Sequence, residues 1–262
     1  MRIKVISLER SAERRQAFAR HNPHLPFEFV PAVDGRAMSP EEVAKTGLFA
    51  PGLNYTPGAH GCALSHLRLW DECIASQTPM TIAEDDAIFR HDFLAQAESA
   101  LARLPQDWDI VMWGWNLDFV LSLVFMPGVS SSITRFEQDR MREAIPRFQA
   151  MSDPPTLLRL DKCWGTCAYA ISPTGAARFK AGCFPLKPFD LAVPVTGQVL
   201  HNTGIDSAMN RLYADMQAYV SFPPLVVTEN DHTISTVQHV RRKSWLSRQW
   251  KQWKQSLRGR RG

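Results

Sequence analysis

The chain contains little cysteine. Five cysteines occur among 262 residues, and no two of them form a CxxC pair. Cys163 and Cys167 are four residues apart, but no second pair with the spacing of a zinc site follows them. We therefore expect reduced and mostly buried thiols, the usual state of cysteine inside a cell.

Long apolar runs are also missing. The longest covers residues 119–129 and contains Pro127 and Gly128, whereas a membrane-spanning helix needs about 20 apolar residues. The apolar stretch at the start of the sequence is too short for a secretory signal, because Glu9 and Arg10 follow it at once. These two absences predict a cytoplasmic protein.

Several signatures of nucleotide and hydrolase chemistry are absent. The sequence contains no GxGxxG, no phosphate-binding GxxxxGK loop, no HExxH and no GxSxG. It therefore lacks the fingerprints of dinucleotide-binding proteins, P-loop proteins, zinc proteases and serine hydrolases. A hydrophobic content of 45% and a charged content of 21% are those of a globular domain, and they exclude a disordered or collagen-like chain.

Acidic residues are absent from the C-terminal part of the sequence. Nine of the 30 basic residues lie beyond residue 240, and none of the 26 acidic residues does. The net charge of +4 is therefore the sum of +9 beyond residue 240 and −5 for residues 1–240. An acidic body would repel a polyanion, so we expect no nucleic-acid partner.

The basic tail, residues 239–262, has helical periodicity. Its large apolar side chains are spaced by 4, 3 and 4 residues and share one stripe, away from the basic ones; they are Leu246, Trp250, Trp253 and Leu257. Such a basic amphipathic helix favours an anionic membrane surface. Docking of the stripe on the domain, a disordered tail and a nucleic-acid arm are the alternatives.

Apolar patterns alternate between strand and helix along the rest of the chain. We expect strands near residues 3–8, 27–33, 80–83, 110–115, 165–171 and 218–222, and helices near 11–19, 61–75, 92–103, 173–181 and 206–213. Residues 117–160 are expected to be irregular, with one charged helix near 135–149. This order predicts an α/β fold, with a mostly parallel, Rossmann-like sheet and helices on both faces.

Three consecutive carboxylates, Glu84, Asp85 and Asp86, follow the strand near residue 80. Ligands of parallel sheets bind at the carboxyl ends of strands. Hard oxygen ligands there suit Mg²⁺ or Mn²⁺, which would also hold a diphosphate. The alternative is a solvated turn before a helix N-terminus, where acidic residues are favoured.

Two further segments are candidates for ligand binding. Arg10 and Arg14 lie one turn apart on the first helix and could meet a phosphate, although a solvated charged face is as good an explanation. Gly61 permits close backbone approach at a helix start, one turn before Ser65 and His66. A histidine on this apolar helix can equally be a hydrogen-bonded core residue.

Taken together, these segments resemble glycosyltransferase family 25, the bacterial lipooligosaccharide glycosyltransferases whose relatives include the collagen galactosyltransferases. The matching segments, in the family's order, are VISLERSAERR (5–15), PAVDGR (31–36), PGAHGCALSHLRLW (57–70), IAEDDAIF (82–89), WGTCAYAIS (164–172) and GIDSAMNRLY (204–213). One departure is Ala59, where the family usually has a glutamate, which puts the choice of acceptor or the activity in doubt.

The resemblance implies a GT-A-like domain over residues 1–238, with a donor half at about 1–115 and an acceptor half at about 116–238. It implies transfer of galactose, with inversion, from a UDP-sugar donor to a lipid-linked lipooligosaccharide or other surface glycan. The enzyme would lie on the inner face of the bacterial inner membrane. The family's metal, Mn²⁺ or Mg²⁺, would be held by Glu84 and Asp86, with His232 as a third ligand.

The resemblance also implies roles for single residues. Asp206 would be the catalytic base, with Asp190 as the alternative. The uridine and ribose pocket would comprise Ser7, Leu8, Arg10, Arg14, Asp34 and Gly35, with Arg15 ranked lower because it can simply face solvent. Gly61, Ser65 and His66 would line the diphosphate or sugar, and Asp85 would face hydroxyl groups. A non-catalytic sugar-nucleotide or membrane-binding protein and a metal-dependent nucleotidyltransferase are the rival functions.

Overall fold

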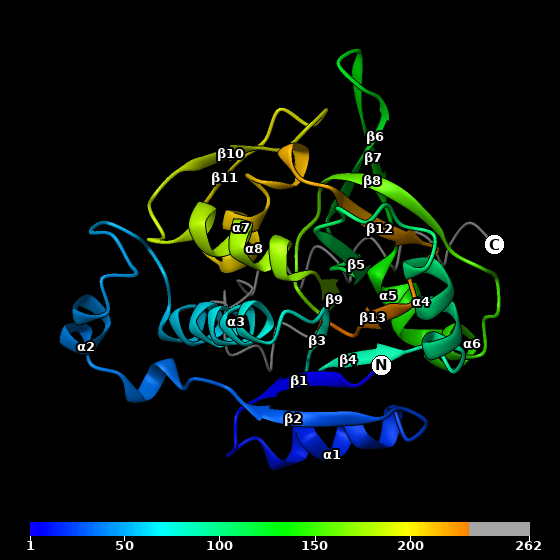
Figure 1. Cartoon of the computed structure of the whole chain (residues 1–262), viewed down its shortest axis with the longest axis horizontal. Coiled ribbons are helices and arrows are strands. Elements are labelled where there is room, and N and C mark those ends of the chain that lie inside the picture. Colours follow the sequence, from blue (N-terminus) through cyan, green and yellow to red (C-terminus); the bar gives the residue numbers. More distant parts are fainter. Residues whose placement is uncertain (231–262) are drawn as a thin grey trace, which may run out of the picture.

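The computed structural model describes residues 1–230 of the chain (Figure 1). The basic tail and His232 therefore lie outside the described residues. The strands are β1 (Ile3–Ser7), β2 (Phe27–Pro31), β3 (Met80–Glu84), β4 (Ala87–Phe89), β5 (Ile110–Gly114), β6 (Val120–Met126), β7 (Ser130–Arg135), β8 (Thr156–Lys162), β9 (Ala168–Ile171), β10 (Asp190–Ala192), β11 (Val199–His201), β12 (Ala218–Phe222) and β13 (Val226–Thr228). The helices are α1 (Ala12–His21), α2 (Pro40–Lys45), α3 (Pro57–Ser76), α4 (Phe93–Leu101), α5 (Gln138–Glu143), α6 (Ile145–Gln149), α7 (Pro173–Cys183) and α8 (Ile205–Met209), with 3-10 turns η1 (Gly35–Ala37) and η2 (Tyr213–Asp215).

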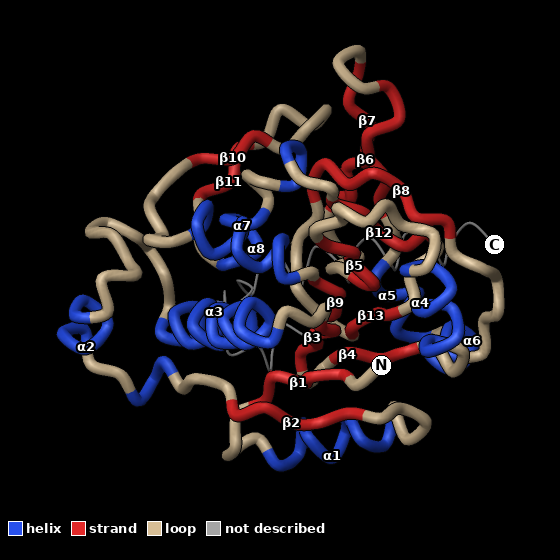
Figure 2. The backbone as a smooth tube through the Cα atoms, in the orientation of Figure 1, coloured by secondary structure: helices blue, strands red, loops and turns tan. Residues whose placement is uncertain are grey.

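A nine-stranded sheet in the order β2-β1-β3-β9-β5-β12-β8-β6-β7 forms the centre of the fold (Figure 2). Strands β2, β1, β3, β5, β12 and β6 run in one direction, while β9, β8 and β7 run against them. The sheet is therefore mixed, with most strands aligned. The strand expected at residues 165–171 lies between β3 and β5 and is antiparallel to both.

Helices cover both faces of the sheet, as the alternating pattern predicts. Ile6 and Met112 point toward the face covered by α3, α7 and α8. Their chain neighbours Val5 and Trp113 point toward the opposite face, which α1 and α4 cover. Side chains alternate along a strand, so two separate apolar clusters follow from one sheet buried on both sides.

Helix α3 illustrates how the sequence places a helix beside the site. Thr56 caps its start by accepting a hydrogen bond from the Ala59 amide, and Pro57 occupies the first helical position. Gln77 ends the helix in a left-handed conformation with φ of 51°. These caps define where the helix begins and ends. The apolar side chains between them, which include Trp70, are buried against the sheet.

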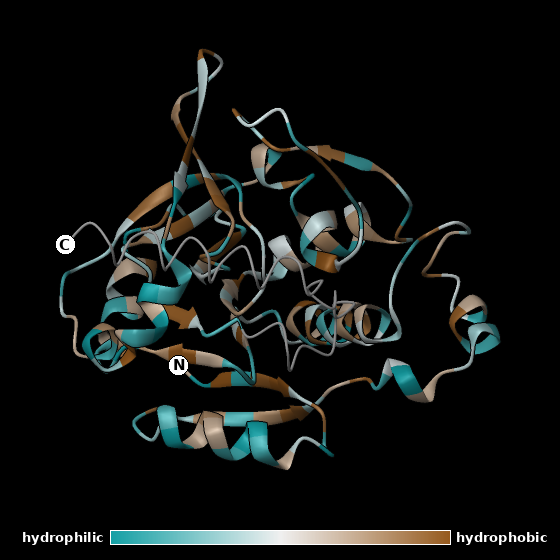
Figure 3. Ribbon diagram, turned by 180° about the vertical axis from the view of Figure 1, so that it is seen from behind, coloured by the Kyte–Doolittle hydropathy of each residue, from teal (hydrophilic) through white to brown (hydrophobic). Residues whose placement is uncertain are grey.

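The expectation of an irregular segment at residues 117–160 is wrong, apart from the charged helix expected near 135–149, which appears as two short helices. This segment forms the β6–β7 hairpin, the short helices α5 and α6, and strand β8. The hairpin extends from the body of the molecule, which is seen from behind in Figure 3. Strand β6 begins buried on both faces, so its residues are apolar except for Ser122 and lack the alternation that indicates a half-buried strand.

The described residues contain no helix that is long and apolar enough to cross a bilayer. All five cysteines are free thiols, and only Cys62 is not fully buried. Two smaller two-stranded sheets, β10–β11 and β13–β4, complete the fold.

Candidate active site

The carboxyl ends of β1 and β3 meet beside the start of α1. The two strands are parallel neighbours, and Ile6 pairs with Glu84. The Ser7 hydroxyl donates to Asp85 Oδ2 over 2.7 Å. Arg14 forms an ion pair with the other oxygen of Asp85 and reaches Asp86 Oδ2 at 3.5 Å. The acidic triplet therefore has a positive partner from the first helix.

Arg15 has a structural role that the expectation of a solvent-facing side chain missed. Its Nε donates to the Ser7 hydroxyl at 3.1 Å, and its Nη2 donates to the Ser7 carbonyl at 3.0 Å. The guanidinium also lies over the Phe29 ring, 5.2 Å from its centroid. Arg15 thus holds the end of β1, while Ser7 in turn orients Asp85.

A first cleft opens at this sheet edge, between the end of β1, the start of α1 and the segment around η1. It brings together most of the predicted donor-binding residues: Ser7, Leu8, Arg10, Arg14, Asp34, Gly35, Ser65, His66 and Asp85. Glu84 lines it as well. The structure thus brings these segments together at one cleft, and their binding roles remain predictions.

Gly61 contributes through its backbone, because it lies behind the cleft and does not line it. A Cβ atom on Gly61 would lie 2.3 Å from the carbonyl oxygen of Val33. The missing side chain lets α3 approach the segment before η1, and the Ser65 hydroxyl then accepts a hydrogen bond of 2.8 Å from the Val33 amide. On the other side of the cleft, Arg10 forms an ion pair with Asp34.

A second cleft adjoins the first. It is lined by Ala59, Cys62, Glu84, Asp86, Asn116, Gly165, Thr166, Cys167, Gly204, Ile205, Asp206, Thr228 and Asn230. Cys62 and Glu84 line both clefts, so the two spaces meet at the carboxylate of Glu84. The position at which this chain departs from the family, Ala59, lies on the wall of the second cleft.

Asp206 faces the second cleft from the first turn of α8. Its Oδ2 accepts from the Gly165 amide at 3.0 Å and its Oδ1 accepts from the Ser207 amide at 2.8 Å. Burial raises the pKa of Asp206, and the negative charge of Glu84 adds to that effect against the two amide hydrogen bonds. Gly165 has φ of 85°, and a Cβ there would lie 2.2 Å from Asn116 Oδ1, so glycine is required.

Two other predicted residues are not brought to these clefts. Asp190 lies in β10, where its mostly exposed side chain pairs with His201 at 2.6 Å. It lines neither of the clefts described above. His232, the proposed third metal ligand, lies outside the described residues.

The acidic residues carry more negative charge than their partners neutralise. Burial and the charges of Glu84 and Asp85 raise the pKa of Asp86 to about 7, although Arg14 opposes this. Asp86 Oδ1 is buried without a hydrogen-bond partner. Burial also acts to raise the pKa of Glu84, but His66, Thr166 and Arg14 outweigh it and lower that pKa. An orphaned carboxylate oxygen beside two further carboxylates fits a divalent cation with oxygen ligands.

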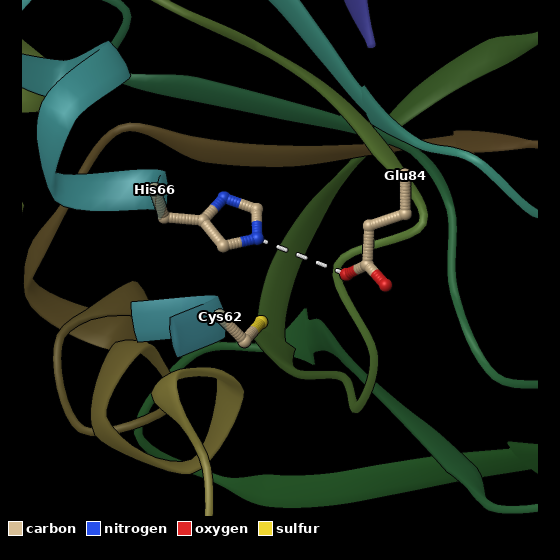
Figure 4. Close-up of side chains that lie close together, drawn as sticks. All are labelled: Cys62, His66 and Glu84. Carbon is tan, nitrogen blue, oxygen red and sulfur yellow. Dashed lines mark ion pairs between the residues drawn. The ribbon is translucent and has the colours of Figure 1, made fainter. Parts of the chain in front are cut away.

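A second ligand set lies nearby. Cys62 and His66, one turn apart on α3, and Glu84 have ligand atoms within 4.8 Å of one another (Figure 4). The Trp70 N–H can only donate, and it donates to the Tyr169 hydroxyl at 2.9 Å. The Tyr169 proton then goes to His66 Nδ1, 2.8 Å away.

This hydrogen-bond chain assigns the tautomer of His66. With Nδ1 as an acceptor, the ring proton is on Nε2, which points at Glu84 Oε1 from 3.7 Å. Coordination of a metal by Nε2 would need that proton to move and would leave the buried Tyr169 hydroxyl without an acceptor. The arrangement therefore fits a buried histidine held by Tyr169, with an unbonded Nε2 near Glu84, better than a ligand for a thiol-binding metal.

Sequence reasoning missed several residues of the site. Thr166 donates to Glu84 Oε1 at 2.5 Å, and Asn116 lines the second cleft. Trp70 and Tyr169 are buried and act only through His66. Their roles depend on contacts between segments about a hundred residues apart, for which a single sequence carries no signal.

Comparison with known proteins shows the family to which the chain is similar. The profile of glycosyltransferase family 25 (LPS biosynthesis protein) matches residues 1–191, which is most of the chain. The chain belongs to this family. The match includes both strand ends and helix α3 but stops before Asp206.

Curated relatives extend the similarity. Procollagen galactosyltransferase 2 of Mus musculus is 26% identical over 239 residues, which cover 86% of this chain and 34% of the relative. Procollagen galactosyltransferase 1 of Danio rerio is 25% identical and covers 85% of this chain and 35% of the relative. A glycosyltransferase 25 family member of Aedes aegypti is 34% identical over 125 residues, covering 43% of this chain and 21% of that protein. The chain thus spans about a third or less of the length of these relatives.

Proposed function

We propose that the chain is an inverting glycosyltransferase with a GT-A-like fold that moves galactose from a UDP-sugar to a hydroxyl of a glycan acceptor. One observation carries the proposal. Two clefts meet at Glu84, one lined by Arg14 of α1 and by Arg10, which lies in the turn before α1 and not on the helix as expected, and the other by the buried carboxylate of Asp206. A donor in the first and an acceptor in the second would meet at their common wall.

The first cleft suits a nucleotide diphosphate. Arg10 and Arg14 supply positive charge for phosphate, and Asp34, which Arg10 and the Arg36 amide hold in place, would use its remaining lone pairs for ribose hydroxyls. Both oxygens of Asp85 are occupied by Ser7 and Arg14, so its role is to position Arg14 at the cleft. The preference for UDP and galactose is inferred from the family and from the names of its relatives.

Glu84 and Asp86 would hold the divalent cation, Mn²⁺ or Mg²⁺, which would offset the negative charge that develops on the leaving diphosphate. Arg14 lies beside the same carboxylates and shares this electrostatic task. Thr166 holds the Glu84 carboxylate at the junction of the two clefts, with His66 Nε2 3.7 Å from the same oxygen.

Asp206 is the proposed base. Inversion requires a base on the side of the reacting carbon opposite the leaving group, and Asp206 lines the second cleft but not the first. Two backbone amides fix its carboxylate, and each oxygen keeps a lone pair for the acceptor hydroxyl proton. Its raised pKa moves it toward the pH at which a carboxylate is an effective base.

The acceptor is proposed to be a lipid-linked surface glycan, such as a lipooligosaccharide, used at the inner face of a bacterial inner membrane. The family description mentions LPS biosynthesis, whereas the mouse and zebrafish relatives are named for procollagen. The basic tail, residues 239–262, remains the predicted contact with anionic lipid, although it lies outside the described residues.

The test is incubation with a panel of UDP-sugars, with Mn²⁺ or with EDTA. We expect UDP to be released from UDP-galactose only when a divalent cation is present. A nucleotidyltransferase would instead release pyrophosphate from a nucleoside triphosphate. If no UDP-sugar is bound or turned over under either condition, the proposal fails.

Asp206→Asn tests the base. The variant should keep donor affinity and lose at least about a hundredfold in transfer rate, since a positioned base contributes about that much or more. Asp190→Asn is the matched control, because Asp190 is exposed and lines neither cleft. Unchanged turnover in Asp206→Asn, or loss in Asp190→Asn, would contradict the assignment.

A further inference from the structure

The exposed large apolar side chains of the described residues are concentrated at two tips. Apart from Met1, they are Phe125 (59% exposed), Met126 (51%) and Val129 (80%) on the β6–β7 hairpin, and Val195 (68%) and Val199 (56%) on the β10–β11 ribbon. Water-exposed apolar groups normally scatter singly over a surface. Their concentration at two tips therefore indicates a contact with something apolar.

The two ribbons stand side by side. A small apolar cluster joins their bases: Val120 from β6 and Leu191 from β10 are buried in it, and Ile133 and Leu200 pack against it. Both tips then extend beyond this cluster on the same side of the body (Figure 1). They can thus contact one common surface.

Both ribbons lack charge between their bases and their tips, with Arg135 and Asp190 at the bases. Residues 119–134 and residues 191–200 contain no Asp, Glu, Lys or Arg, in a protein in which 21% of residues are charged. Exposed strands usually carry charged side chains that prevent unwanted pairing. Their absence means that no charge would have to leave water if the tips entered an apolar medium.

The shape of the hairpin tip also limits the partner. Met126 and Val129 close a tight turn through a backbone hydrogen bond of 3.0 Å, with Pro127 and Gly128 between them. Narrow tips of this kind offer no flat face on which a folded protein could pack. Fluid hydrocarbon requires no complementary shape, so the tips suit the interfacial region of a bilayer.

We propose that the tips of the β6–β7 hairpin and the β10–β11 ribbon insert into the interfacial region of a lipid bilayer. Strand β6 runs in the same direction as β1 and β3, so the hairpin leaves the sheet at the edge that carries the acidic triplet. The proposal goes beyond the proposed function and does not depend on it, because vesicle binding needs neither substrate.

The test is flotation of the full chain with vesicles of phosphatidylcholine alone in about 1 M salt, where the screening length of about 3 Å suppresses attraction by the basic tail. Wild-type protein should float with the vesicles. Phe125→Ser combined with Met126→Ser should lower the partition coefficient about tenfold or more. Phe125→Leu combined with Met126→Leu, the matched control, should bind as the wild type does.

Both variants should melt like the wild type, because the two side chains are outside the core. Failure of the wild type to float, or equal flotation of the serine variant, would overturn the proposal and leave any lipid binding to the tail. Concentration-dependent dimers that the serine variant abolishes in size-exclusion chromatography would also overturn it, since the tips would then join two copies of the chain.

Discussion

Asp86→Asn should stabilise the protein in the absence of metal. Asp86 is crowded by Glu84 and Asp85, its Oδ1 has no partner, and its pKa is raised from 3.8 to about 7. An acid whose pKa is raised on folding destabilises the folded state once the pH exceeds its unfolded value. Asparagine keeps the shape of the side chain and removes the charge, so the cost disappears.

The magnitude follows from the shift. The full difference between 3.8 and about 7 corresponds to about 4 kcal/mol. The side chain is 37% exposed, so solvent screening reduces this to about 1–2 kcal/mol. The gain should be absent below about pH 4, grow as the pH rises toward 7, and stay constant above it. A gain of this size raises the melting temperature by about 2–8 °C in a domain of this length.

Thermal unfolding in EDTA measures the stability gained by removing the charge, and thermal unfolding with Mn²⁺ measures the stability gained from the cation. Wild-type protein should gain stability from Mn²⁺, because a cation that binds only the folded state stabilises it by mass action. Asp86→Asn should be more stable than wild type in EDTA and gain little from Mn²⁺. A variant that is less stable than wild type in EDTA above pH 7, or that responds fully to Mn²⁺, would refute the reasoning.

Three further substitutions test the supports of the site. Gly61→Ala should destabilise the fold by about 1–3 kcal/mol or more, because its Cβ would lie 2.3 Å from a backbone oxygen. Tyr169→Phe should cost about 1–3 kcal/mol in denaturant unfolding, because the Trp70 N–H loses its acceptor in a buried site. Arg15→Lys should weaken UDP binding several-fold in calorimetry, because a lysine cannot reproduce the fork that holds Ser7.

Each of these has a control or a contrary outcome. Wild-type stability of Gly61→Ala would show that the close approach of α3 is dispensable. Tyr169→Phe is a buried change and should be compared with Tyr219→Phe, whose hydroxyl is partly exposed. Wild-type UDP affinity in Arg15→Lys, with Arg15→Gln as a second variant, would mean that the fork is not needed for donor binding.

The sequence predicted the fold wherever a segment is buried on one face or carries its own caps. The end of helix α3 and the strand that ends at Glu84 appear close to their expected bounds, because apolar spacing and Pro79 define them locally, whereas α3 begins at Pro57, four residues before its expected start, because the Thr56 cap was not recognised. The β6–β7 hairpin was missed, since Val120 to Leu123 are buried on both sides and do not alternate. The antiparallel insertion of β9 was missed as well, because strand order depends on distant pairing.

Some features of the candidate site could likewise be predicted from the sequence and others could not. Residues at the ends of β1 and β3 could be predicted to converge, since parallel strand ends share one edge of the sheet. The tautomer of His66 and the fork from Arg15 could not, because each rests on single contacts between remote segments. Asp190 has the right chemistry for a base, but it lies in β10, away from both clefts.

The place of β9 in the sheet has a consequence for how the chain folds. Residues 168–171 pair with β3 on one side and β5 on the other. These two earlier strands are therefore not neighbours, and the edge of each that faces β9 stays unpaired until that later segment has been made. During synthesis, the backbone N–H and C=O groups on these edges of β3 and β5 lack their sheet partners until about residue 171 has been made. A protein shortened before that point would keep two unpaired strand edges and should aggregate, so the expected boundary near residue 115 separates no independently folding unit.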